Sequence, residues 1–303
     1  MQERLIDELR DSFSGAGILE NEPMSRHTTF RAGGSAAVFM SVTDIEMLKD
    51  SVRFLAARDV PYFVIGNGSN ILVGDKGYDG VVIRQVGDLG RVTVSGNMIK
   101  AGAGALLSEV SASAVKSSLA GFEFASGIPG TVGGALRMNA GAYDGEMKQI
   151  VRSADVLRPD GTVEILDNEK MKFGYRTSII RTEQLIVLEA EIELHPGSKD
   201  EIRSRIDELA SRRREKQPLE YPSAGSTFKR PEGYFAGKLI SDAGLKGYTV
   251  GGAQVSEKHA GFVINRGGAT AADIKTLVED VQNKVYETSG VHLEREVIFV
   301  GDF

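Results

Sequence analysis

The chain has 303 residues, of which 41% are hydrophobic, so it is long enough for about two packed domains. The formal net charge of −6 argues against a nucleic-acid groove as the main surface, and the absence of Cys excludes disulfides and thiolate chemistry. The four His residues lack metal-ligand spacing, and no apolar run approaches the roughly eighteen residues of a spanning helix. We therefore predict no metal centre and no membrane span. The N-terminal stretch is charged where a signal peptide is apolar, so we expect a cytoplasmic protein.

The first quarter of the chain predicts two helices and two strands. Residues 1–20 have the apolar spacing of an amphipathic helix that closes around Gly15 and Gly17, and residues 36–42 alternate as a short strand does. Thr43 and Glu46 form a capping-box pattern before a second helix, which ends before Pro61. A buried strand over 62–65 then leads into a glycine-rich loop.

The middle of the chain predicts a compact α+β module. Gly96-Asn97 and Pro159-Asp160-Gly161 are hairpin signals, each between two short β-type runs. The predicted elements in this part are strands at 81–86, 91–101, 151–158, 162–166 and 184–194, with a helix at 107–118.

The last third predicts three helices and a final strand. Ser198 and Glu201 form a capping box for a helix over 198–216, and its cationic end either complements the helix dipole or touches a ligand phosphate. A short helix over 238–245 precedes a longer one over 270–288, which Gly290 terminates. Residues 291–300 read as a strand with Glu294 and Glu296 on one side.

The segment from 121 to 143, GFEFASGIPGTVGGALRMNAGAY, is too rich in glycine for an ordinary helix or strand. Glycines let backbone N–H groups approach a bound anion, and the segment adds hydroxyl and amide groups. A run of tight turns is the alternative interpretation. Residues 65–73, IGNGSNILV, repeat this chemistry after a strand. Two such loops predict one divided site for a diphosphate and a flat heterocycle.

These two loops, GNGSNILV at 66–73 and SGIPGTVGGALRMNAGAY at 126–143, resemble those of the UDP-N-acetylenolpyruvoylglucosamine reductase family. Further motifs extend the resemblance over nearly the whole chain, and their order and number make the combination specific. They are HTTFRAGG at 27–34, FGYRTSI at 173–179, AGSTFKRP at 224–231, AGKLISDAGLKGYTVGGAQVSEKHAGFVIN at 236–265 and LEREVIFVG at 293–301.

The resemblance implies an α+β fold, with a two-part FAD-binding domain of the vanillyl-alcohol-oxidase/PCMH type followed by a smaller α+β substrate domain. It divides the chain into an N-terminal helical segment (1–25), the FAD-binding domain (26–196, with subdomains 26–80 and 81–196), a linking helix (197–218) and the substrate-binding domain (219–303). No obvious insertion lies between 183 and 199, so the chain resembles the branch without the extra substrate-closing loop.

The resemblance also implies non-covalent FAD, with NADPH as the electron donor. Two loops are expected to bind the flavin. The expected residues are Gly66, Asn67, Gly68, Ser69, Asn70, Ile71, Ser126, Gly127, Pro129, Gly130, Thr131, Gly133, Gly134, Asn139, Gly141 and Ala142. Leu136-Arg137 departs from the family's commoner small-apolar-then-tyrosine pair, which puts one contact near the flavin or substrate in question.

Three residues match the family's catalytic positions. Arg176 matches the arginine that polarises the substrate carboxylate, Ser226 the serine that donates a proton, and Glu296 the active-site glutamate near the end of the chain. The cations expected at the substrate diphosphate are Lys229, Arg230 and Lys238.

The implied reaction is NADPH-dependent reduction of UDP-N-acetylenolpyruvoylglucosamine to UDP-N-acetylmuramate in peptidoglycan precursor synthesis, which serves cell-wall biogenesis, cell shape and cell division. A cytoplasmic monomer is expected, with a UDP-sugar and NADPH as its partners and neither nucleic acid nor a membrane. Two alternatives stay open: another FAD-dependent oxidase on the same scaffold, and a nucleotide-sugar binding protein without turnover.

Overall fold

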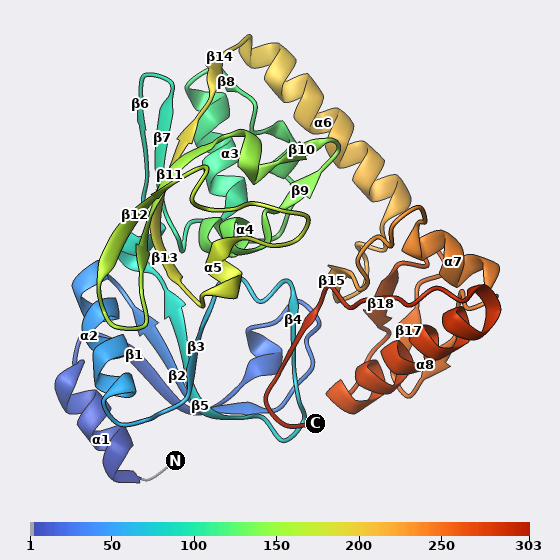
Figure 1. Ribbon diagram of the computed structural model, residues 1–303, viewed down its shortest axis with the longest axis horizontal. Coiled ribbons are helices and arrows are strands. Elements are labelled where there is room, and N and C mark those ends of the chain that lie inside the picture. The colour runs from blue at the N-terminus through green and yellow to red at the C-terminus, as the bar shows by residue number, and fades with distance from the viewer. Residues whose placement is uncertain (1–2) are drawn as a thin grey trace. The chain divides into compact units, whose positions relative to one another are not determined.

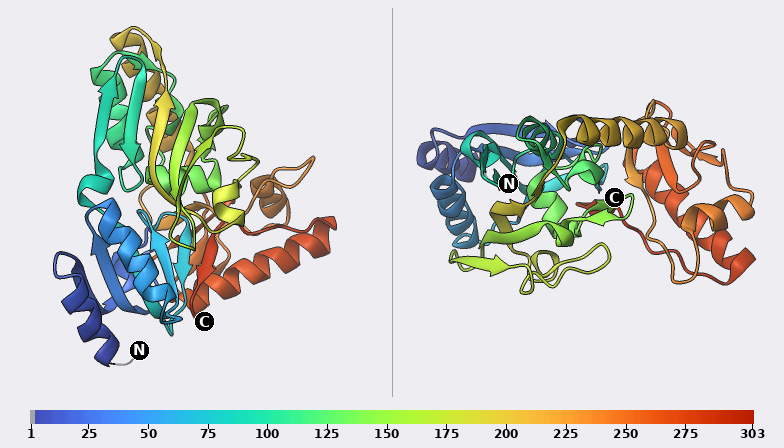
Figure 2. Two further views of the ribbon diagram at one scale, coloured as in Figure 1. Left: turned by 60° about the vertical axis from the view of Figure 1, so that its left-hand side comes forward. Right: turned by 90° about the horizontal axis from the view of Figure 1, so that it is seen from above.

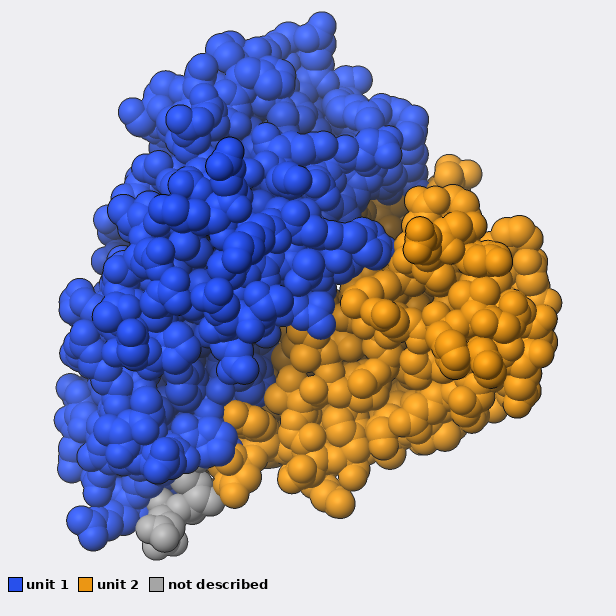
Figure 3. All heavy atoms as spheres, viewed as in Figure 1, with its two compact units in different colours: residues 1–19, 38–67, 80–212 blue, residues 20–37, 68–79, 213–303 orange. Residues whose placement is uncertain are grey.

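A computed structural model describes residues 3–303, which form two compact units (Figure 3). Unit 1 contains the described residues up to Leu19 together with 38–67 and 80–212, and unit 2 contains 20–37, 68–79 and 213–303. These boundaries differ from the expected domains because residues 20–37 and 68–79 pack with the C-terminal third of the chain. The division into a flavin domain and a substrate domain remains a prediction. No helix within residues 3–303 is long and apolar enough to cross a membrane.

Near the N-terminus, two helices pack beside a sheet whose strands lie largely in unit 1 (Figure 1). The helices are α1 (Glu3–Ser12) and α2 (Ile45–Ala56). Four strands pair in the order β1-β2-β5-β3, and their bounds are β1 (Gly17–Pro23), β2 (Ser35–Val42), β3 (Tyr62–Ile65) and β5 (Tyr78–Gln85). Parallel pairing of β3 with β5 delivers the chain into the first glycine loop, as predicted.

Two predictions for this region are wrong in detail. The first helix ends at Ser12, before the predicted stop around Gly15 and Gly17, and the rest of the segment predicted as helical is not helical, since Gly17–Pro23 is extended. Residues 1–2 of the prediction lie outside the described chain. The second helix is capped by Asp44 and not by Thr43. An Asp44 carboxylate oxygen accepts the Met47 N–H at 2.9 Å, and a carboxylate suits the positive end of a helix.

The larger part of unit 1 is built on an antiparallel five-stranded sheet, which Figure 2 shows from two sides. The order is β12-β11-β13-β7-β6, with bounds β6 (Val92–Ser95), β7 (Met98–Gly102), β11 (Val151–Leu157), β12 (Val163–Asp167) and β13 (Ile186–Glu193). Both predicted hairpins are confirmed, and β12 lies at one edge.

Helices α3 (Leu107–Lys116) and α4 (Val132–Met138) bury apolar side chains against this sheet in one core. The core includes Ile99, Val110, Leu136 and Ile192. Short elements complete the unit: β8 (Leu119–Ala120), β9 (Gly141–Ala142), β10 (Gly145–Glu146), β14 (His195–Pro196) and α5 (Ile179–Thr182), with 3-10 turns at Gly87–Gly90, Glu123–Ala125 and Met147–Gln149.

Helix α6 (Lys199–Lys216) starts in unit 1 and ends in unit 2. The predicted Ser198 cap is present, since its hydroxyl accepts the Glu201 N–H at 3.5 Å. Only Ile202 and Leu209 of this helix are buried, so most of its surface faces solvent.

Unit 2 combines a four-stranded sheet with two helices around a core of its own. The sheet order is β15-β18-β17-β16, and its bounds are β15 (Ser223–Ser226), β16 (Thr249–Val250), β17 (Ala253–Val255) and β18 (Phe262–Asn265). The helices are α7 (Ala236–Asp242) and α8 (Ala271–Ser289), and a 3-10 turn spans Met24–Arg26. Thr270 caps α8 and Gly290, with φ 71°, ends it as predicted.

A two-stranded parallel sheet in unit 2 pairs β4 (Ile71–Val73) with β19 (Ile298–Val300). The strand predicted over 291–300 is therefore limited to its last part. Residues 291–297 are irregular apart from a bridge between Phe228 and Arg295, so strand alternation does not place Glu294 and Glu296 on one side.

Candidate functional site

The two glycine loops meet within unit 1. The Asn67 side-chain amide donates to the Pro129 carbonyl at 3.0 Å. A Cβ atom added to Gly66 would lie 2.2 Å from the Thr131 hydroxyl oxygen, so only glycine permits this approach. Gly66 and Asn67 of the first loop therefore lie against the start of the second loop. The prediction of one divided site requires such an approach of the two loops.

The N-terminal end of α4 is tied to the strand-helix connection at 103–107. The Gly133 N–H donates to the Ala103 carbonyl at 2.9 Å, and the Gly130 carbonyl accepts the Leu107 N–H at 3.0 Å. A Cβ at Gly133 would lie 3.0 Å from the Ala103 Cβ. Close packing within the chain thus accounts for Gly133. Gly134 differs, because it is exposed and its nearest neighbour is the Thr131 hydroxyl at 3.6 Å from an added Cβ, which leaves its backbone open to a ligand.

Asn139 is buried and left-handed, with φ 42°, at the C-terminal end of α4. Its amide donates to a Glu146 carboxylate oxygen at 3.0 Å and to the Gly174 carbonyl at 3.1 Å, and it accepts the Lys148 N–H at 2.9 Å. Both donors are therefore used inside the chain. This geometry does not favour Asn139 as a direct cofactor ligand; it gives Asn139 the role of fixing the loop that begins at Gly174.

That loop carries Arg176 in a left-handed conformation with φ 54°, a conformation that costs energy for a residue with a Cβ. Its contacts include two hydrogen bonds. The Arg181 guanidinium donates to the Arg176 carbonyl at 3.0 Å, and the Arg176 guanidinium donates to the Gly141 carbonyl at 3.3 Å. The structure thus brings the predicted catalytic arginine to the predicted flavin segment at Gly141.

Arg137 contributes further positive charge to this region. The Ser178 hydroxyl donates to its carbonyl at 3.0 Å, which ties α4 to the start of α5. Burial, and then the charge of Arg181, lower the pKa of the Arg137 guanidinium from its ordinary value. Arg137 and Arg181 were not among the predicted site residues. For Arg137, the departure from the family pattern at Leu136-Arg137 was the available signal; the sequence carried none for Arg181.

In unit 2, backbone contacts place Ser226 close in the fold to Glu296. Ser226 ends β15 beside Phe262, directly after Gly225, whose φ is 74°. The next residue, Thr227, accepts the Glu296 N–H at its carbonyl at 2.9 Å. Both side chains are partly exposed. Two of the three predicted catalytic residues are therefore brought together by one short backbone bridge.

The remaining part of the first glycine loop supports the same region of unit 2. The Asn70 side chain donates to the Glu296 carbonyl at 3.2 Å, and the Asn70 carbonyl accepts the Ile298 N–H at 3.0 Å. Gly68, with φ 61°, packs where a Cβ would lie 1.9 Å from the His27 carbonyl oxygen. Asn70 thus holds Glu296 through its backbone, a role that the flavin prediction did not include.

The three predicted substrate cations all have partners in unit 2. Lys229 forms an ion pair with Glu294 at 2.8 Å, and Lys238 forms one with Asp242 at 2.7 Å on the exposed face of α7. The Arg230 guanidinium lies 4.0 Å from the centre of the Phe235 ring. For Lys238, the ordinary helical ion pair explains the position, and its prediction as a substrate residue gains no support.

The other predicted flavin residues divide between the units. Ser126 donates its hydroxyl to the Glu123 carbonyl at 2.8 Å, and Ala142 pairs with Gly145 in the β9–β10 hairpin. Ser69 and Ile71 belong to unit 2, where Ile71 starts β4, and Gly127 belongs to unit 1. Their contact with flavin stays a prediction.

Two family models match the chain, an FAD binding domain over residues 36–167 and the C-terminal domain of UDP-N-acetylenolpyruvoylglucosamine reductase over 217–300. These matches and the observed elements confirm the expected α+β fold class. The close packing of the glycine loops and the open backbone at Gly134 fit a flat, phosphate-bearing cofactor such as FAD.

Relatives of similar length carry one name. A UDP-N-acetylenolpyruvoylglucosamine reductase from Clostridium botulinum is 52% identical over 98% of this chain and 97% of its own length. One from Caldanaerobacter subterraneus is 50% identical over 100% of both chains. The crystal structure of the Thermus caldophilus enzyme, 36% identical, superposes with a TM-score of 0.81 over 94% of this chain and 98% of that chain. The chain belongs to the UDP-N-acetylenolpyruvoylglucosamine reductase family.

Proposed function

We propose that this protein reduces UDP-N-acetylenolpyruvoylglucosamine to UDP-N-acetylmuramate with NADPH as the reductant and bound FAD as the carrier of the hydride. Hydride adds to the vinyl carbon and a proton adds to the adjacent carbon, so the double bond is reduced while NADPH is oxidised. The observation that carries the proposal is the approach of the Ser226 and Glu296 segments through the 2.9 Å bond from the Glu296 N–H to the Thr227 carbonyl.

Arg176 binds the substrate carboxylate in this proposal. Negative charge grows on that carboxylate as hydride adds, so a fixed guanidinium stabilises the transition state more than the ground state. The bond from the Arg181 guanidinium holds the left-handed backbone of Arg176, and the bond from the Arg176 guanidinium to the Gly141 carbonyl limits the orientations of the side chain. A planar fork held in this way matches a carboxylate in one orientation.

Ser226 donates the proton to carbon, and Glu296 orients the substrate or assists that transfer. A serine hydroxyl is a weak acid, but the intermediate that receives its proton is strongly basic. The positive φ of Gly225 turns the chain just before Ser226, and among residues 3–303, apart from the two chain neighbours of Gly225, no atom lies within 4 Å of the position of a Gly225 Cβ.

The test is anaerobic reduction of the purified holoprotein by NADPH, followed by reoxidation with the enolpyruvyl substrate. In Ser226→Ala, flavin reduction should keep its rate, and reoxidation should slow by roughly a hundredfold to ten-thousandfold, the usual contribution of a positioned general acid. Ser223→Ala, in the same strand β15, is the matched control and should change neither step.

Three other results would contradict the proposal. Reoxidation of Ser226→Ala at the unmodified rate would remove the assigned proton donor. Rapid reoxidation by oxygen with no response to the enolpyruvyl substrate would favour an oxidase. Binding of the UDP-sugar without turnover would favour a binding protein. We further propose a cytoplasmic monomer, in keeping with a nucleotide-sugar substrate and NADPH, and sedimentation of the purified chain tests the oligomeric state.

A further inference from the structure

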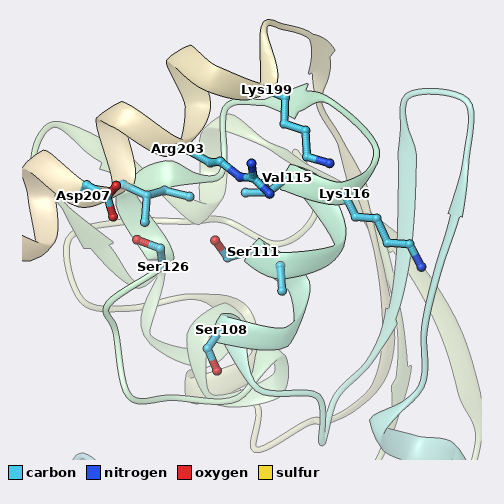
Figure 4. A pocket seen from close by; sticks show the side chains of 10 residues that line it. Ser108, Ser111, Val115, Lys116, Ser126, Lys199, Arg203 and Asp207 are labelled. Atoms are coloured by element: carbon cyan, nitrogen blue, oxygen red, sulfur yellow. The ribbon is translucent and has the colours of Figure 1, made fainter.

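A cavity of about 670 Å³ lies within unit 1 between helices α3 and α6 (Figure 4). One face of each helix lines it, as the helical spacing shows. The lining residues on α3 are Ser108, Ser111, Ala112, Val115 and Lys116; those on α6 are Lys199, Arg203, Ile206 and Asp207; and Ser126 completes the wall. Arg176, Ser226 and Glu296 do not line this cavity, whereas Ser126 is one of the residues expected to bind the flavin.

Two cations from α6 are directed into this space. In Figure 4 the Arg203 side chain reaches from α6 toward Val115, with Ser111 below it, and Lys199 extends from the same helix, whereas Lys116 points away from them. Among residues 3–303, no carboxylate forms an ion pair with Arg203 or Lys199. Asp207 lies at the other end of the cavity. Cations without counter-ions at the same cavity attract an anion.

The hydroxyls of the cavity supply the polar contacts that an anion needs. Ser111 is only 5% exposed, and its hydroxyl has no hydrogen-bond partner among the described residues. Its oxygen is not fully buried, so it faces the cavity, where water or a ligand can form a hydrogen bond with it. Ser126 already donates to the Glu123 carbonyl at 2.8 Å, so its oxygen is left to accept a hydrogen bond.

The walls and the far end of the cavity define the rest of the ligand. Val115, Ile206 and Ala112 give an apolar surface, and Asp207 is an acceptor for hydroxyl groups. The volume exceeds what a single inorganic anion fills and suits a small phosphorylated sugar or nucleotide.

We propose that this cavity binds a small organic phosphate, with the phosphate on Arg203, Lys199 and Ser111 and the hydroxyl-bearing part toward Asp207. The site is separate from the reaction proposed above. Ser126 links it to the glycine segment, since this residue precedes Gly127 directly, so occupancy of the cavity and the position of that segment are coupled.

Calorimetric titration of the FAD-loaded protein with inorganic pyrophosphate and with ribose 5-phosphate tests the proposal. Both should bind saturably in roughly the millimolar range or below. Arg203→Met should weaken both by about tenfold or more, because a charge-assisted hydrogen bond is lost. Arg205→Met is the matched control; Arg205 lies on the same helix, paired with Glu208 and outside the cavity lining, and its loss should change binding less than about twofold.

Two variants separate a site from general surface charge. Ala112→Phe fills the cavity from an exposed position without changing charge and should abolish binding. Asp207→Asn should tighten pyrophosphate about twofold by removing a like charge and should weaken ribose 5-phosphate relative to pyrophosphate.

Equal effects of Arg203→Met and Arg205→Met, or binding unchanged by Ala112→Phe, would overturn the proposal in favour of nonspecific attraction. Binding to the flavin-free protein but not to the FAD-loaded protein would assign the cavity to the flavin site, and so would also overturn it. Absence of saturable binding by either probe would do the same. None of these outcomes depends on the proposed reaction.

Discussion

Replacement of Asn139 tests whether this residue acts mainly through its hydrogen bonds within the chain and not through a contact with the cofactor. Its amide makes three hydrogen bonds within the chain, to Glu146, Gly174 and Lys148. Two of them join neutral groups and contribute about 1 kcal/mol each, and the bond to the carboxylate contributes about 1.5 to 3 kcal/mol.

The sum of about 3.5 to 5 kcal/mol is an upper figure, because water replaces part of the lost bonding at Glu146 and Lys148, which are partly or fully exposed. We expect Asn139→Gly to lower the free energy of unfolding by about 2 to 4 kcal/mol. Asn139→Ala should lower it by about 1 kcal/mol more, because alanine, unlike glycine, is strained at φ 42°.

Urea unfolding measures both losses, and amide hydrogen exchange locates them. The Thr177 N–H donates to the Gly174 carbonyl at 3.3 Å, so its exchange should accelerate when Gly174 is released by Asn139. Asn168→Ala is the matched control, since the Asn168 amide donates to the carbonyls of Lys148 and Val151 at 2.8 and 2.6 Å in the same unit. It should lower stability without changing exchange at Thr177.

Loss of the Asn139 side chain should also affect the two half-reactions differently. Asn139→Gly should slow reoxidation by the enolpyruvyl substrate more than it slows flavin reduction, since the loop that it releases carries Arg176. Unfolding free energies of both Asn139 variants within about 1 kcal/mol of the unmodified protein, together with unchanged exchange at Thr177, would refute this reasoning.

Three further predictions follow from other contacts. Arg181→Met removes the donor to the Arg176 carbonyl and should slow substrate-driven reoxidation about tenfold in stopped-flow, with Arg181→Lys restoring part of it and flavin reduction unchanged. Gly66→Ala should lower the free energy of unfolding in urea by about 1 to 3 kcal/mol, because the added methyl group clashes with Thr131, and by less when Thr131 is also replaced by Ala. Equal losses with and without Thr131→Ala would contradict the clash. Burial, followed by the charge of Lys246, lowers the pKa of His259 below its ordinary 6.5. The unfolded chain therefore binds more protons than the folded chain, and the free energy of unfolding decreases as pH falls from about 6.5 toward the folded pKa. His259→Gln should flatten this pH dependence in unfolding curves.

Local patterns in the sequence predicted the elements whose signals are local. The hairpins at Gly96-Asn97 and Gly161, the capped helix from Thr270 to Gly290 and strand β3 all depend on residues that are neighbours in the chain. The cap of α2 was misplaced by one residue, because the adjacent Thr43 and Asp44 satisfy the same capping pattern, and the end of α1 was placed too late in the small residues that follow it.

What sequence reasoning missed depends on contacts between distant residues. Strand alternation over 291–297 failed because most of that segment lacks a strand partner within the described chain. Separate hydrogen bonds to residues far away in the sequence hold it, including those with Thr227, Lys229 and Asn70. Glycines of the two loops were predicted to face a ligand, and the structure shows that Gly66 and Gly133 also permit close packing against Thr131 and Ala103. A glycine in the sequence indicates that another group packs closely against the backbone, but it does not indicate whether that group is a ligand or another part of the chain.

The parallel pairing of β4 with β19 constrains the order in which parts of this chain can fold during synthesis on the ribosome. Asn70 donates to the backbone of Glu296, a residue 226 positions later, so this contact waits for almost the entire chain. At about 5 to 20 residues per second, the loop after Gly68 spends roughly 10 to 45 s without its partner strand. During that time β4 presents an unpaired edge of Ile71, Leu72 and Val73, an apolar stretch open to wrong pairing. Segments of unit 1 from 80 onward pair with nearer neighbours, so the five-stranded sheet is complete well before β4 acquires its partner.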